Sequence, residues 1–184
     1  MTFEEGINNL TNSFIEMLDL AEEYFGDRDK KWTFIGIEFL NNGPYIKYYP
    51  NNKISIVLLK DCSKTFPDHP QLIFQLAHET CHLLFPTEKL NTNYLIEGIS
   101  TYFSKIYQEK KYPESKYAIE NIKNSKYFIA YQLVEKILKN DSYAIKKIRQ
   151  KKINITNISN IEIKGFNFGL NDEEIEILLS KFIY

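Results

Sequence analysis

The sequence has few cysteines, glycines and prolines, and it has no surplus of charge of either sign. Two cysteines, Cys62 and Cys81, are too few to hold together a disulfide-rich fold. With 23 basic and 24 acidic residues the net charge is −1, so the composition does not favour nucleic acid as a partner. No run approaches the roughly 18 apolar residues of a membrane span. The acidic start also lacks the basic and apolar regions of a secretory leader. We therefore expect a reduced, cytoplasmic protein with neither a membrane nor a nucleic-acid partner.

The composition of the sequence is typical of one globular domain. Residues 1–184 are 43% hydrophobic and 26% charged, which is enough to bury a core. Apolar side chains that recur every three or four positions predict an opening helix over residues 3–25. Three segments rich in aromatic and β-branched residues follow within residues 32–59, separated by the turn sequences Asn41–Pro44 and Pro50–Lys53. Their short connections predict a three-stranded antiparallel β-meander.

The next segment is predicted to be a helix over residues 70–85. Pro70 suits the first helical turn, Asp68 is the expected N-cap, and Pro86 ends the pattern. A connector then leads to a further helix over residues 95–108.

The remainder, residues 113–184, is predicted to be mostly helical. Its one exception is residues 153–170, which are expected to be irregular or weakly β. Acidic residues in Asn171–Glu174 favour the start of a final helix. The predicted fold class is therefore α+β, with an N-terminal helix, a β-meander and a helical region in one domain.

The helix predicted over residues 70–85 carries an H-E-x-x-H pattern, which is typical of zinc hydrolases, in His78, Glu79 and His82. At about 3.6 residues per turn, His78 and His82 project from one helix face and can reach one ion. Glu79 then lies beside the ion without binding it, where it can take a proton from metal-bound water. The pattern predicts His78 and His82 as ligands of Zn²⁺ and Glu79 as a catalytic general base.

A catalytic zinc site needs a third protein ligand and one open position. Glu97 begins the following helix, and the connector before it is long enough for the chain to reverse and cross the first helix. Gly98 beside it allows the two helices to approach closely. The alternative is a solvated glutamate that only stabilises the helix start. Given the pattern upstream, we interpret Glu97 as the third ligand.

Together these residues resemble the gluzincin metallopeptidases, the group that contains thermolysin and the zinc aminopeptidases. In that group H-E-x-x-H is followed by a helix with the pattern Glu-Gly-x-x-x-Tyr, and this chain has Glu97, Gly98 and Tyr102. The resemblance implies a zinc metallopeptidase that acts on a peptide or protein. The segment from Tyr127 to Ala130 resembles the Tyr-x-x-Gly helix of the aminopeptidase-like branch. This implies that Tyr127 is a catalytic residue that stabilises the oxyanion.

The family binds its substrate along an edge strand that precedes the active helix. The last predicted strand, Ile54–Leu59, stands in that place in the sequence. The resemblance therefore implies that a peptide is added as an extended strand along Ser55, Ile56 and Val57. It covers roughly residues 32–138 and leaves the last part of the chain without a role.

Two other interpretations of the sequence are open. The same fold can hold a structural zinc and act as an inactive protein-interaction module, or a helical interaction protein can carry H-E-x-x-H by chance. Cys81 is predicted to be a small buried residue, and His69 a capping or surface residue. The basic run from Lys146 to Lys152 is predicted to be a solvated helix face. The sequence does not indicate an oligomeric state.

Overall fold

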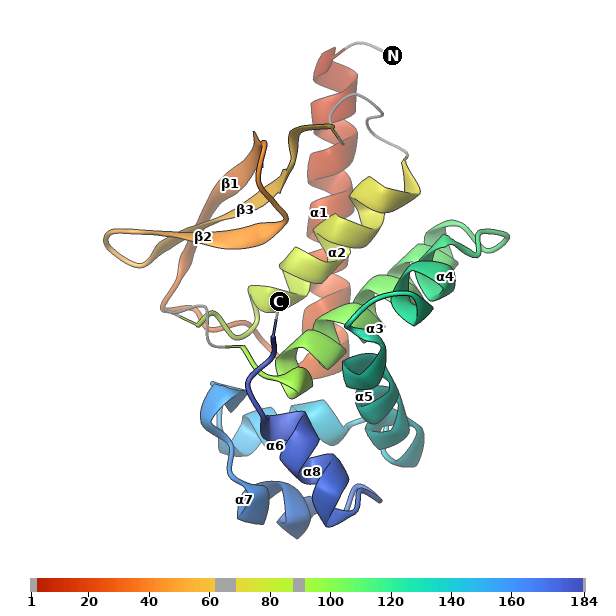
Figure 1. The fold of residues 1–184 in the computed structure, drawn as a ribbon. Helices are drawn as coiled ribbons and strands as arrows, with labels where there is room; N and C mark the ends of the chain where they lie inside the picture. Colours follow the sequence, from red (N-terminus) through yellow and green to blue (C-terminus); the bar gives the residue numbers. More distant parts are fainter. Residues whose placement is uncertain (1–2, 62–68, 88–91, 184) are drawn as a thin grey trace.

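The computed structural model describes residues 3–61, 69–87 and 92–183 and has an α+β fold (Figure 1). Its elements are α1 (Phe3–Phe25), β1 (Thr33–Leu40), β2 (Tyr45–Tyr49), β3 (Lys53–Leu59), α2 (Pro70–His82), α3 (Tyr94–Lys111), α4 (Tyr117–Lys123), α5 (Phe128–Asn140), α6 (Ala144–Lys151), a 3₁₀ turn (Ile155–Asn157), α7 (Asn160–Phe166) and α8 (Asp172–Leu179). The α+β class is confirmed, and so are the helices predicted near residues 3–25, 70–85 and 95–108.

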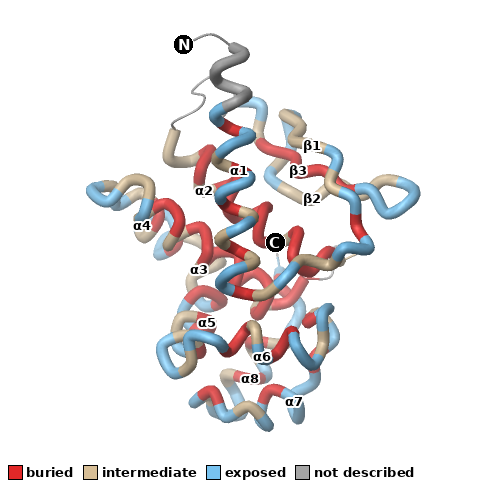
Figure 2. Tube along the Cα trace, turned by 180° about the vertical axis from the view of Figure 1, so that it is seen from behind, coloured by how far each residue is buried: buried red, intermediate tan, exposed pale blue. Residues whose placement is uncertain are grey.

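Helices α2 and α3 form the centre of the molecule, and the other elements cover them. Both are buried along most of their length, whereas α1 keeps an exposed side (Figure 2). α1 packs on α2, the sheet lies beside α2 through β3, and α5 packs along α3. In the described part of the chain, no helix is both long and apolar enough to cross a membrane.

The strands form a mixed sheet in the order β1-β3-β2, so the predicted antiparallel meander is wrong. β3 is parallel to β1 and antiparallel to β2, with Ile56 paired to Ile37 on one side and to Ile46 on the other. The short connection after β1 passes the end of β3 instead of forming a hairpin. Gly43 lies at this crossing, where a Cβ would be only 3.1 Å from the carbonyl carbon of Leu58.

This strand order also overturns the prediction that a peptide pairs with Ser55, Ile56 and Val57. β3 is the central strand, and both of its edges are already paired, one with β1 and one with β2. The side chains are buried as well, and Ser55 is 1% exposed. Its hydroxyl donates a 2.5 Å hydrogen bond to the Glu38 carboxylate, so the role of Ser55 is structural. Among the described strands, the edge strand in contact with α2 is β2.

Helix α2 has a defined start and end. The predicted N-cap, Asp68, lies outside the described residues. The N-cap is His69, whose Nδ1 accepts a hydrogen bond from the Gln71 backbone at 3.3 Å, and this confirms the capping role predicted for His69. Beyond His82, backbone hydrogen bonds between residues three positions apart continue as far as Phe85, directly before Pro86.

The stretch at residues 153–170 contains α7 and a 3₁₀ turn, which contradicts the prediction of irregular or weakly β structure. Ser159 and Glu162 form a capping box at the start of α7. This local set of hydrogen bonds outweighs the β preference of the isoleucines around it. Asn171 and Glu174 form a second capping box at α8, where the sequence predicts a helix start.

Arg149 is buried, so the prediction that the basic run forms a solvated helix face is wrong for this residue. It is 4% exposed, and its guanidinium lies over the Phe85 ring with 5.8 Å between them. It donates hydrogen bonds to four backbone carbonyls, those of Phe25, Gly26, Asp27 and Leu84. These carbonyls belong to the end of α1 and to the turn after α2. Arg149 on α6 therefore holds three separate segments together.

We expect Arg149→Met to lower the free energy of unfolding by about 3 kcal/mol or more, because each hydrogen bond from a charged donor contributes about 1.5–3 kcal/mol. Arg149→Lys should recover little of this, since an ammonium group lacks the planar fork that reaches both segments. Lys147→Met on the same helix removes only an ion pair with Asp141 near the surface. It should change the stability by about 0.5 kcal/mol or less. Urea unfolding measures all three variants, and equal losses at positions 147 and 149 would contradict the role of Arg149.

Candidate metal centre

Helix α2 presents His78 and His82 one turn apart, with their ring centroids 4.9 Å from each other. The opposite side of the helix is anchored in the core by side chains that are 0% exposed, namely Leu72, Ile73, Leu76 and Ala77. Cys81 is also 0% exposed, and burial raises the pKa of its thiol to about 12. The prediction that Cys81 is a small buried residue is confirmed.

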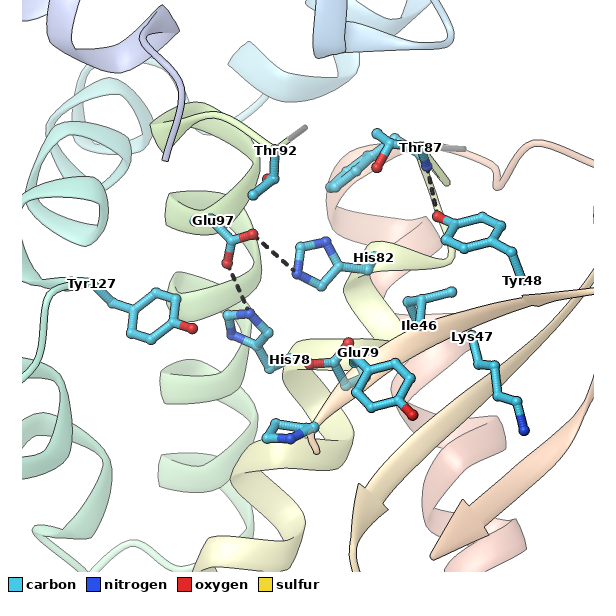
Figure 3. A pocket seen from close by; sticks show the side chains of 13 residues that line it. Ile46, Lys47, Tyr48, His78, Glu79, His82, Thr87, Thr92, Glu97 and Tyr127 are labelled. Atoms are coloured by element: carbon cyan, nitrogen blue, oxygen red, sulfur yellow. Dashed lines mark hydrogen bonds and ion pairs between the residues drawn. The ribbon is translucent and has the colours of Figure 1, made fainter. Parts of the chain in front are cut away.

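Glu97 faces both histidines from α3. Its Oε2 lies 3.2 Å from Nε2 of His78, and its Oε1 lies 3.7 Å from Nε2 of His82 (Figure 3). The start of α3 is fixed by Asn93, whose side chain accepts a hydrogen bond from the Ile96 backbone at 3.0 Å. The Glu97 side chain is 1% exposed. The alternative of a solvated glutamate at a helix start is therefore wrong.

These distances have the size that a shared ion would impose. Two ligand atoms that each lie about 2.1 Å from a tetrahedral zinc ion are about 3.4 Å apart. The observed 3.2 Å and 3.7 Å fall on either side of this value. His78, Glu79 and His82 also offer ligand atoms within 4.8 Å of one another. This largely buried group can hold a metal ion, and the Glu97 carboxylate adjoins it.

The charges in this cluster depend on one another. Burial alone would raise the pKa of Glu97, but His82 and His78 hold it well below its usual value. Burial alone would lower the pKa of His82, but Glu97 and Glu79 raise it above its usual value. Burial raises the pKa of Glu79, which the two histidines offset only in part. A bound cation would stabilise both carboxylates in their charged form.

Tyr127 approaches the cluster from the start of α5. Its ring centroid lies 5.5 Å from that of His78, at an angle of 73°. Its hydroxyl points toward His78 (Figure 3). Burial, together with Glu97 and Glu79, raises the pKa of this hydroxyl, so the group keeps its proton at neutral pH and can donate a hydrogen bond. The structure thus brings Tyr127 together with the three residues of the H-E-x-x-H pattern.

Two cavities meet at His78 and Glu79. One, of about 460 Å³, runs along β2 and under the turn after α2. The other, of about 440 Å³, lies between the first half of α2 and α4. Pro44 and Tyr127 line both of them. The histidines and Glu79 therefore lie in a cleft that continues on both sides of them.

The wall formed by β2 is the part of the site that the sequence did not reveal. Tyr45, Ile46, Lys47 and Tyr48 line the larger cavity. The Tyr48 hydroxyl accepts a 2.8 Å hydrogen bond from the Thr87 backbone, which joins β2 to the chain that follows α2. The aromatic residues of this segment predict a strand, but only the strand order places that strand beside His78, Glu79 and His82.

Gly98 permits a close approach, but between α3 and α5 instead of between α2 and α3 as predicted. A Cβ at this position would lie 2.6 Å from Val134 Cγ2 and 2.8 Å from the carbonyl carbon of Ala130. Because Tyr127 stands at the start of α5, this contact also sets the distance between Tyr127 and Glu97.

No family model matches this chain, and no curated protein or solved structure matches it either.

We expect a divalent metal, tested as Zn²⁺, to raise the melting temperature of the metal-free protein, because an ion that binds only the folded state stabilises it by about 2.7 kcal/mol at 100 times its Kd. His82→Ala should abolish the rise. His69→Asn, at the third histidine of the chain, keeps a side chain that can cap α2 and should retain the rise. Loss of the zinc effect in both variants, or in neither, would contradict the assignment of His82 to the cluster.

Gly98→Ala should destabilise the protein by about 1–3 kcal/mol, because the added methyl group forces α5 away from α3. Gly165→Ala is the matched control, since a Cβ at Gly165 has nothing within 4 Å and lies in a described helix. Thermal unfolding compares the two. A Gly98→Ala protein as stable as the wild type would show that α5 does not depend on this contact.

Proposed function

We propose that this protein is a zinc-dependent metallopeptidase that hydrolyses peptide bonds. The observation that supports this most is the approach of Glu97 to Nε2 of both His78 and His82, at 3.2 Å and 3.7 Å. Two imidazoles and one carboxylate with an open fourth position are a ligand set of catalytic zinc. Structural zinc sites instead fill all four positions with protein ligands, and here a cleft lies beside the cluster.

In the proposed mechanism, His78, His82 and Glu97 would hold a zinc ion, which when bound would lower the pKa of a water molecule toward about 7 and polarise the carbonyl of the substrate. Glu79 accepts the proton of that water and later delivers a proton to the leaving amine. Tyr127 donates a hydrogen bond to the oxyanion, and one such donor is typically worth about 3 kcal/mol.

The substrate in this proposal is an extended peptide that pairs with β2. β2 is an edge strand of the described sheet and is paired there with β3. Ile46 and Tyr48 lie along the larger cavity, next to the histidines. Backbone pairing of this kind gives affinity with little sequence discrimination.

The cleft also supports cleavage within a chain instead of at its end. The cavities extend away from His78 and Glu79 in two directions, along β2 on one side and toward α4 on the other. A polypeptide that lies across the cluster thus has room before and after the scissile bond. The proposed activity is therefore that of an endopeptidase.

The test is the cleavage of an unfolded protein substrate by the zinc-loaded enzyme. We expect Glu79→Gln to lower kcat by about 10²–10⁴-fold, the usual contribution of a general base, with no loss of bound zinc. Glu109→Gln is the control, since Glu109 lies outside the cleft and pairs with Lys105 at 2.7 Å. It should keep the full rate.

Two results would contradict the proposal. If zinc is bound and Glu79→Gln cleaves as fast as the wild type, Glu79 is not the base. If zinc is bound and the wild type cleaves no peptide, the metal is structural, as in an inactive relative of the peptidases.

A further inference from the structure

The segment after α8 runs beside the start of α3, the helix that carries Glu97 (Figure 1). The Phe182 backbone donates a 2.9 Å hydrogen bond to Thr92, and the Tyr94 backbone donates a 3.3 Å hydrogen bond to Ser180. Asn93 and Lys181 form an antiparallel bridge between them. Because Asn93 also caps the helix that carries Glu97, this short ladder fixes residues 180–182 next to the site.

The ladder places the Phe182 ring against Tyr127. The two rings are nearly parallel, with centroids 5.0 Å apart and an angle of 22°. Phe182 also meets Tyr94 edge to face at 4.9 Å, and it is 2% exposed. Tyr127 in turn meets the ring of His78. The Tyr127 ring is therefore held between Phe182 and His78, and removing Phe182 would free it to move away from the cluster.

We propose that Phe182 is a positioning residue that holds the Tyr127 hydroxyl in the orientation needed for catalysis. The proposal rests on the proposed function, because Tyr127 acts there as the oxyanion donor. It gives a role to the C-terminal part of the chain: residues 180–182, which follow α8, set the position of Tyr127 in the proposed active site.

The kinetic test combines Phe182→Leu with Tyr127→Phe in the zinc-loaded protein. Tyr127→Phe should lower kcat by about 10²–10³-fold, as the loss of one oxyanion donor does. Phe182→Leu should lower kcat by about 10-fold with little change in KM, since it misplaces an interaction made only in the transition state. In the Tyr127→Phe background it should have no further effect on kcat. Independent, additive losses would overturn the proposal.

The matched control is Phe168→Leu. Phe168 is another buried phenylalanine of the C-terminal region, 4% exposed and stacked on Phe166 at 5.1 Å. It should lower the melting temperature to a similar extent and leave kcat unchanged. If Phe168→Leu lowers kcat as much as Phe182→Leu, the effect is one of general stability and the proposal fails.

A measurement without substrate separates this proposal from the proposed function. In protein labelled with 3-fluorotyrosine, the ¹⁹F resonance of Tyr127 is the one lost in Tyr127→Phe. Phe182→Leu should move this resonance by more than its linewidth, and Phe168→Leu should leave it in place. An unmoved resonance in Phe182→Leu overturns the positioning role even if the enzyme is active. A moved resonance in a protein that cleaves nothing supports the contact of Phe182 with Tyr127 on which the positioning depends, and contradicts only the peptidase.

Discussion

The structure depends on the burial of one carboxylate, that of Glu97. Taking a carboxylate out of water costs several kcal/mol unless opposite charges and hydrogen bonds compensate for it, and this side chain is 1% exposed. The compensation comes from Nε2 of His78 and of His82. The contact of Glu97 with His78 and His82 therefore both joins α3 to α2 and brings the residues of the proposed metal site together. A cation bound between the three side chains would strengthen that contact, which couples metal binding to the stability of the central helix pair.

Elements α6, α5 and β2 each position a different part of the chain around the contact of Glu97 with the histidines. Arg149 holds the turn after α2 through the Leu84 carbonyl, so α6 determines where the chain leaves the histidines. Gly98 lets α5 pack directly on α3, and this brings Tyr127 beside His78. Tyr48 joins β2 to the chain beyond α2 and closes the cleft on the side of the sheet. The site thus draws on the N-terminal sheet, the central helices and the C-terminal region, although the residues proposed as ligands lie on only two helices.

Short-range patterns made the centre of the site predictable from the sequence. The four-residue spacing of His78 and His82 fixes their common face, and the prolines around α2 bound its helix. What the sequence could not supply is long-range pairing. The turn signals at Asn41–Pro44 predict a reversal of the chain but not which strand lies alongside. The sequence therefore favours β3 as an edge strand, whereas β3 is central in the sheet and β2 lies at its edge. Nothing local marks Arg149 as buried within a basic run, because its partners are carbonyls far away in the sequence. The helix α7 is a different case: the isoleucines around it favour a strand, whereas the Ser159–Glu162 capping box starts a helix in the structure.

The central claim is that His78, His82 and Glu97 bind one zinc ion while Glu79 stays beside it as a base. A crystal structure of the zinc-loaded protein tests this most directly. The account predicts one ion with both Nε2 atoms at about 2.0–2.1 Å and a Glu97 oxygen at about 2.0–2.2 Å, with the fourth position open to the cleft and Glu79 unbound. An ion bound by Glu79 in place of Glu97, or a protein that binds no ion at saturating zinc, would contradict it.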